Sequence, residues 1–173
     1  MGNNAERVST LRILKSMMIV MIALVVLALL LVGYFFATAK VSIEACNANG
    51  VSAAMRQEQF DRLKTELSQD AFIGTRFRTD TLGNAEDYAL ITYTLRLDNQ
   101  CLVPIDMVEV QIVPDANDYL QLGDLTVHSL GAKSQGDITA TLLTRKDSHA
   151  IRELIVTYYV WGVSYQLRQT YGG

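Results

Sequence analysis

The sequence predicts a mainly β domain of antiparallel strands, attached to a membrane by a single N-terminal helix. Three observations support this: residues 16–39 are uncharged, a short helical pattern follows, and a period of two runs from there almost to the end. The chain has 173 residues, and the part beyond residue 40 is long enough for one domain with a hydrophobic core. We expect a cytoplasmic tail, a transmembrane helix, a connector, an amphipathic helix and a β domain, at residues 1–15, 16–39, 40–51, 52–69 and 70–173.

The apolar segment has the length and composition of a membrane-spanning helix. Thirteen residues between 17 and 37 are Leu, Ile, Val or Phe, which favours insertion by about 4 to 8 kcal/mol. As a helix, residues 16–39 would extend about 36 Å, more than the roughly 30 Å of a hydrocarbon core. Tyr34, Phe35 and Phe36 stand together at its C-terminal end, where an interfacial aromatic belt is expected. The lipid bilayer is therefore the first expected partner.

Flanking charge predicts the orientation. Arg7, Arg12 and Lys15 precede the span with one acidic residue, whereas residues 41–173 hold 11 Lys or Arg and 17 Asp or Glu. Because Lys and Arg near a span stay in the cytoplasm, we expect a single-pass protein of the cell membrane, with a cytoplasmic N-terminus and an extracytoplasmic C-terminal domain. Cleavage after Ala39 is the alternative, since residues 37–39 read Ala-Thr-Ala. The apolar run exceeds the 7–15 residues of a signal peptide and favours an uncleaved anchor.

The next two segments are predicted as a connector and a helix. Residues 41–50 are mostly polar and end in Asn49-Gly50, which is a turn signal. Ser52 is the expected N-cap of the helix. The apolar side chains that fall near one face of this helix are Met55, Phe60, Leu63 and Leu67. Two interpretations remain: a surface helix packed on the β domain, or a membrane-proximal stalk or partner helix.

From residue 72 onward the pattern predicts seven or eight short strands. Both prolines stand at strand ends, where a missing N–H does least harm. Close turn signals and the lack of a second helical pattern indicate an antiparallel β-sandwich of immunoglobulin-like type. The expected strands are residues 72–80, 88–98, 105–113, 119–122, 125–130, 138–144, 151–161 and 163–171.

Residues 91–143 resemble two known families. Their matching passages are Leu97-Asp98-Asn99, Val108–Val113, Ser129-Leu130-Gly131 and Ile138–Leu143. These passages are similar to bacterial FxLYD-type domains and to the second class of late-embryogenesis-abundant domains. Gly131-Ala132 stands where those families place a proline and a glycine. The resemblance implies an immunoglobulin-like sandwich and offers no catalytic set to transfer.

No catalytic, cofactor-binding or metal-binding residues are predicted, and we do not expect an enzyme. His128 lies in a strand and His149 in a polar turn, and neither belongs to an H-x-x-x-H or H-E-x-x-H motif. Leu120 stands where a calcium-binding loop needs glycine, so a solvated turn is favoured over calcium binding for Asp115, Asn117, Asp118 and Asp124. An acidic domain without a basic stripe disfavours binding to nucleic acid.

A group of aromatic residues near the C-terminus is the candidate interaction surface. Tyr and Trp dominate binding hot spots, but strand alternation divides these residues between two faces of the sheet. Packing within the sheets is therefore favoured, and any exposed subset would form a recognition patch. The residues are Tyr158, Tyr159, Trp161, Tyr165 and Tyr171.

Cys46 and Cys101 form the candidate disulfide. Both lie beyond the apolar segment, where an extracytoplasmic location permits oxidation. A bridge would close a loop of 56 residues and stabilise the domain by at most about 4 kcal/mol. Two separate thiols are the alternative.

These observations predict a non-catalytic envelope interaction or assembly module whose partner is a membrane or envelope protein. The alternative is a ligand-binding or sensory ectodomain. Because the predicted cytoplasmic tail is only 15 residues long, such an ectodomain would have to signal through a membrane partner.

Overall fold

The computed structural model describes residues 3–38 and 40–172, with side chains from residue 12 onward. It contains two units, an N-terminal helix and a domain that begins at Lys40. The helix, α1 (Asn3–Ala37), includes a segment, Arg12–Ala37, that is long and apolar enough to cross a membrane. The predicted apolar helix is thus confirmed, although the helical backbone already begins within the expected tail. Ala39, after which cleavage was the alternative, lies outside the described residues.

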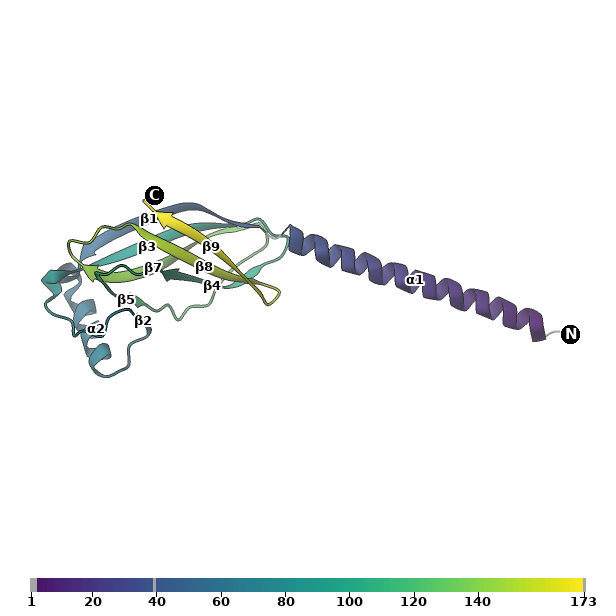
Figure 1. Ribbon diagram of the computed structural model, residues 1–173, viewed down its shortest axis with the longest axis horizontal. Helices are drawn as coiled ribbons and strands as arrows, with labels where there is room; N and C mark the ends of the chain where they lie inside the picture. The colour runs from purple at the N-terminus through teal and green to yellow at the C-terminus, as the bar shows by residue number, and fades with distance from the viewer. Residues whose placement is uncertain (1–2, 39, 173) are drawn as a thin grey trace. The chain divides into compact units, whose positions relative to one another are not determined.

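The domain is mainly β and contains two antiparallel sheets (Figure 1). One sheet has the strand order β1-β3-β7-β5-β2, and the other has the order β6-β4-β8-β9. Two 3-10 turns, η1 (Ala53–Arg56) and η2 (Ala85–Asp87), and the helix α2 (Gln57–Ser68) complete it. The strands are β1 (Val41–Ser52), β2 (Gly74–Arg76), β3 (Tyr88–Asn99), β4 (Ile105–Ile112), β5 (Asp118–Leu122), β6 (His128–Leu130), β7 (Gln135–Arg145), β8 (Arg152–Val160) and β9 (Val163–Tyr171).

Alternating apolar residues of the two sheets form the main core. On β3, every second side chain from Ile91 to Leu97 is buried, as the period of two predicts. Val108, Val110 and Ile112 of β4 are also buried, while Glu109 and Gln111 between them are exposed. Strand β8 alternates in the same way along its whole length. Burial on one face of each strand therefore sets the register of both sheets.

The predicted connector is a strand, which corrects the expectation for residues 40–51. Strand β1 pairs with β3 from Val41 opposite Asn99 to Ser52 opposite Ala89, with a register shift between Ile43 and Ala45. It is an edge strand with many exposed residues, so its sequence lacks the apolar alternation that marks a buried strand. Asn49-Gly50 lies inside this strand and makes no turn, and the Ser52 side chain makes no capping hydrogen bond.

Two other predicted strands are shorter than expected. Of residues 72–80, only Gly74–Arg76 pair, with β5 as their partner. The chain then leaves the sheet, and the amides of Phe77 and Arg78 donate hydrogen bonds to the Tyr119 carbonyl. Of residues 125–130, only His128–Leu130 pair, with β4. Both segments lie at sheet edges, where few ladder hydrogen bonds extend a strand.

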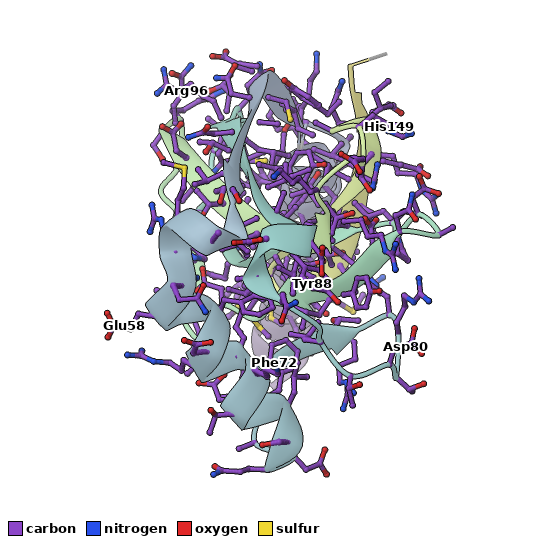
Figure 2. All side chains as sticks on the ribbon, turned by 90° about the vertical axis from the view of Figure 1, so that its left-hand side faces the viewer. Glu58, Phe72, Asp80, Tyr88, Arg96 and His149 are labelled. Atoms are coloured by element: carbon purple, nitrogen blue, oxygen red, sulfur yellow. The ribbon has the colours of Figure 1, made fainter. Side chains whose placement is uncertain are left out.

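Helix α2 covers one end of the five-stranded sheet and forms a second core with it. Phe60 of α2 packs on Tyr88, with ring centroids 5.4 Å apart, and Tyr88 contacts Tyr119 edge-on at 5.0 Å. Figure 2 shows α2 with Glu58 pointing outward and Tyr88 on its sheet side. The predicted helix and its surface-packing interpretation are confirmed. Met55 is 80% exposed, against expectation, because it lies in the 3-10 turn η1 and is out of phase with α2.

We expect Phe60→Ala to lower the free energy of unfolding by about 3 to 5 kcal/mol, because it removes a buried ring and leaves a cavity in the second core. Urea denaturation of the full chain in detergent micelles, followed by circular dichroism, measures this loss. The matched control is Glu58→Ala on the exposed face of α2, which should change stability by less than about 0.5 kcal/mol. Equal effects of the two substitutions would show that α2 does not pack on the sheet.

Candidate functional site

A buried ion pair joins the two sheets. Arg152 of β8 donates hydrogen bonds from Nε and Nη2 to the two carboxylate oxygens of Asp118 on β5, at 2.7 and 2.8 Å. Arg152 is 3% exposed and Asp118 is not exposed at all. Arg152 Nη1 also donates to the carbonyl oxygens of His149 and Ile151. The guanidinium is thus satisfied on several sides, as a buried charge requires.

The surroundings of this pair keep both groups charged. Burial alone would raise the pKa of Asp118, but hydrogen bonds from Arg152 and from the Asp115 amide outweigh it and hold the pKa below its usual value. The hydrogen bond to Asp118 raises the pKa of Arg152. His149 Nε2 lies 3.7 Å from Asp115 Oδ2. Two of the acidic residues considered for calcium therefore take part in this network.

Two buried side-chain amides, those of Asn99 and Gln121, form hydrogen bonds with backbone groups elsewhere in the domain. Asn99, at the end of β3, donates to the Gly131 carbonyl at 2.7 Å and accepts a hydrogen bond from the Cys101 amide at 3.0 Å. Gln121 of β5 donates to the Val110 carbonyl at 2.6 Å and accepts from the Ile112 amide at 2.8 Å. The Gln121 side chain thereby occupies an edge of β4 that β6 is too short to reach.

A pocket of about 400 Å³ lies beside this edge of β4. We call it the β4 pocket. It is bounded by β4, by the ends of β2 and β5, by residues 123–128 and by parts of β7 and β8. Its lining includes Thr75, Met107, Glu109, Asp124, Val127 and Tyr159. Its volume falls at the lower end of the range typical of ligand sites, about 300–1,000 Å³.

A β-bulge shapes the mouth of the β4 pocket. The pairing of β4 shifts register between Ile105 and Val108 toward β6, and between Asp106 and Glu109 toward β8. Met107 stands inside both shifts, has a φ of 51° and is largely exposed. A positive φ is uncommon for methionine, and bulges and such backbone outliers concentrate near functional sites.

A hydrogen bond between His128 and Asp124 fixes the loop on the other side of the pocket. His128 Nε2 lies 2.6 Å from Asp124 Oδ2, and Asp124 Oδ1 accepts a hydrogen bond from the Thr126 amide at 2.8 Å. The hydrogen bonds from His128 and Thr126 lower the pKa of Asp124 to about 2. Asp124 therefore carries its charge throughout the physiological pH range. The sequence pattern placed His128 in a strand, where the structure has it, but gave no sign of its contact with Asp124.

Large apolar side chains are exposed on and beside the same loop. Leu125 is 78% exposed and Val127 is 74% exposed, and Met107 and Ile73 are largely exposed as well. Ile73 is adjacent because its carbonyl accepts a hydrogen bond from the Gly123 amide. We call Ile73, Met107, Leu125 and Val127 the apolar rim. The sequence pattern does not reveal this rim, because Leu125 and Val127 fall in the strand predicted for residues 125–130; Gly123 and Asp124 before them were the available signal of a loop.

The candidate aromatic residues do not form one surface. Tyr158 is buried and stacks on Tyr165, with centroids 5.6 Å apart. Tyr171 contacts the buried Tyr93 edge-on, and Tyr159 lines the β4 pocket. Trp161 is half exposed in the two-residue turn between β8 and β9, where it and Gly162 both have positive φ. Packing within the sheets accounts for most of this group.

On α1, the predicted belt residues lie near the C-terminal end of the helix. The rings of Tyr34 and Phe35 meet edge-on at 6.3 Å, and the Thr38 hydroxyl donates to the Tyr34 carbonyl at 2.8 Å. The predicted cytoplasmic cations Arg7, Arg12 and Lys15 stand on the N-terminal half of the same helix. In the described part of the chain, no group of three or more His, Cys, Asp or Glu residues has the arrangement of a metal site.

No protein-family model matches the chain, and no curated protein is significantly similar to it. The family resemblance of residues 91–143 therefore stays a prediction.

The predicted disulfide between Cys46 and Cys101 is absent, and both residues are free thiols. The Cys101 thiol lies 3.6 Å from the Lys40 carbonyl oxygen, at the start of β1. Cys46 lies farther along this strand, opposite Leu95. Six residues of extended chain span roughly 20 Å, well beyond the Cα separation of about 7 Å that a disulfide allows. The prediction failed because it treated the segment around Cys46 as a flexible connector.

We expect two thiols per chain after unfolding without reductant. In the folded chain, Cys46 should react slowly and Cys101 should be protected, because Cys101 is buried. Burial raises the pKa of the Cys46 thiol, so its labelling rate should keep increasing above the pH at which a free cysteine is fully ionised. Mass spectrometry after alkylation counts the thiols. A peptide pair that is linked without reductant would contradict the structure.

We expect Asp118→Asn to lower the free energy of unfolding by about 3 to 5 kcal/mol at pH 7, since it leaves Arg152 buried without its counter-charge. Because the folded pKa of Asp118 is lowered, the carboxylate stabilises the fold above its unfolded pKa of about 3.9. That stability is lost as the pH falls through the folded value. The variant should therefore show a weaker loss of stability below pH 4 in urea denaturation.

The control for this substitution is Asp137→Asn. Asp137 pairs with Arg96 on the exposed face of the five-stranded sheet, and such pairs contribute about 0 to 1 kcal/mol. If Asp118→Asn were no more harmful than Asp137→Asn, the buried pair would not be what joins the sheets.

Proposed function

We propose that this protein is a single-pass membrane protein that presents an immunoglobulin-like β-sandwich outside the membrane. In this proposal, the domain is a non-catalytic interaction or assembly module of the cell envelope. It binds a second membrane or envelope protein. The N-terminus is cytoplasmic and the anchor is retained.

The anchor and its orientation are supported by sequence and chain connection. Three residues separate the apolar segment Arg12–Ala37 from the first strand, β1, which begins at Val41. Cations flank the N-terminal end of this segment, and the domain after it is acidic. This distribution of charge favours the N-in orientation.

The immunoglobulin-like assignment is supported by the strand connections. The chain passes repeatedly between the two sheets, from β3 to β4, from β4 to β5 and from β7 to β8. Such crossings between antiparallel sheets are typical of Greek-key sandwiches. The buried Asn99, the last residue of β3, stands in the passage whose sequence resembles the FxLYD-type domains.

The apolar rim is the observation that carries the interaction role. Leu125 and Val127 expose most of their surface to solvent on a loop whose backbone is held by Asp124. Burying a large aliphatic side chain stabilises a complex by about 1.5 to 3 kcal/mol relative to leaving it in water. Clustered apolar side chains beside a concave site are typical of protein-binding surfaces.

A ligand-binding or sensory ectodomain is the second candidate, and the β4 pocket favours it. The two candidates differ in what stabilises the domain. A small ligand that occupies the pocket would raise the melting temperature of the purified chain, whereas an interaction module would require its protein partner.

The interaction role predicts a site-specific contact in native membranes. A photo-crosslinking amino acid at Leu125 should give a discrete adduct with one membrane or envelope protein. The same group at Glu58, on the exposed face of α2, should not give this adduct. Val127→Ser should weaken the adduct formed from Leu125, because it removes apolar contact area. Equal adducts from both positions, or none from either, would contradict the proposed role.

The membrane topology is tested in the same cells. The intact chain should remain in membranes after a high-salt wash, and external protease should reach the C-terminal domain. Recovery of a soluble chain that begins at Lys40 would refute the anchor.

A further inference from the structure

We propose that the β4 pocket receives an arginine or lysine side chain of the protein partner, while apolar neighbours of that residue pack on the apolar rim. This inference rests on the proposed function and names the chemistry of the contact. It follows from the charge, the lining and the shape of the pocket.

The charge of the β4 pocket is complementary to a cation. Glu109 and Asp124 line it, and none of its lining residues is lysine or arginine. Glu109 is exposed at the β4 bulge. Asp124 is already paired with His128 and keeps its charge, because its pKa is about 2. An acidic group would be repelled here, and a cationic one would be attracted.

The remaining lining fits the rest of a long cationic side chain. Met107 and Val127 are apolar, line the pocket and are largely exposed, so the methylene groups of an arginine or lysine can pack on them. Thr75, Thr157 and Tyr159 also line the pocket, and their hydroxyl groups can accept hydrogen bonds from a guanidinium or an ammonium. Methionine adapts its shape to a partner more readily than other large apolar residues do.

The volume and the apolar rim favour a side chain of a protein over a free small molecule. A pocket of about 400 Å³ is small, and the exposed Leu125 and Val127 continue the apolar surface beyond it. Arginine is enriched at the centres of protein interfaces, surrounded by contacts that exclude water. A protein segment with one cationic residue between apolar residues would fill the β4 pocket and cover the apolar rim at the same time.

Methionine NMR tests the proposal on the full chain. Outside the N-terminal segment, the chain has only Met55 and Met107, so methyl labelling places one probe at the pocket and one at η1. The chain is placed in nanodiscs of phosphatidylcholine, which carry no net charge. It is titrated with acetyl-Leu-Arg-Leu-amide, and separately with the analogue in which uncharged citrulline replaces arginine.

We expect the arginine peptide to shift the Met107 methyl resonance saturably and to leave that of Met55 unchanged. The citrulline peptide should bind at least about threefold more weakly, because it lacks the charge. Glu109→Gln should weaken binding of the arginine peptide about threefold to tenfold. The matched control, Glu58→Gln on α2, should leave that binding unchanged. Equal binding of the two peptides, an effect at Met55 as large as at Met107, or no saturable shift would overturn the proposal.

The same variant separates this inference from the proposed function. If the Leu125 crosslink in native membranes persists with Glu109→Gln and the arginine peptide does not bind, the module binds its partner by other contacts. If Glu109→Gln weakens that crosslink to the extent that it weakens peptide binding, both proposals are supported.

Discussion

The ion pair between Arg152 and Asp118 is the interaction on which the arrangement of the two sheets depends. Arg152 begins β8 in one sheet, Asp118 begins β5 in the other, and both side chains are almost fully buried. The pair fixes the sheets relative to each other at one end of the domain, while Asn99 and Gln121 bind backbone groups farther along. Apolar packing alone would allow the two sheets to slide over each other. The directional hydrogen bonds of these buried polar side chains form in only one relative position of the sheets. Replacing both Arg152 and Asp118 by apolar residues would separate two contributions of the pair, one to the stability of the domain and one to the unique arrangement of its sheets.

This polar framework also explains why the β4 pocket stays open. Strand β6 has three residues, from His128 to Leu130, and pairs with β4 only as far as Val108, so it leaves the rest of that β4 edge without a strand beside it. The Gln121 side chain bonds the Val110 carbonyl and the Ile112 amide at that edge, and the bulge at Met107 interrupts the pairing of β4 with both neighbouring strands. Unpaired strand edges attract non-specific pairing. In this domain the Gln121 side chain, the bulge at Met107 and the loop that carries Asp124 surround the β4 pocket at this edge. The apolar rim lies beside the pocket.

Much of the fold could be predicted from local patterns because those patterns reflect burial. Strands β3, β4 and β8 have one face in the core, so each carries a period of two, and α2 carries a helical period for the same reason. Strand β1 could not be found in this way. It is held by its backbone hydrogen bonds to β3 and exposes much of its length. Backbone pairing does not require particular residue types, so the sequence of β1 shows no strand pattern. The disulfide prediction depended on that error, since a strand holds Cys46 far from Cys101.

Local patterns along the chain suffice to predict the apolar helix, the mainly β character of the domain and the length of most strands, because hydrophobic periodicity is a local property of the chain. Which polar residues are buried together, and which apolar residues stay exposed, depends instead on contacts formed in the folded domain. Asp118 and Arg152 are 34 residues apart, and the pairing of β2 with β5 brings Ile73 beside Gly123, at the start of the loop that carries Leu125. The candidate site arises from contacts between distant segments, and a local pattern carries no information about those contacts.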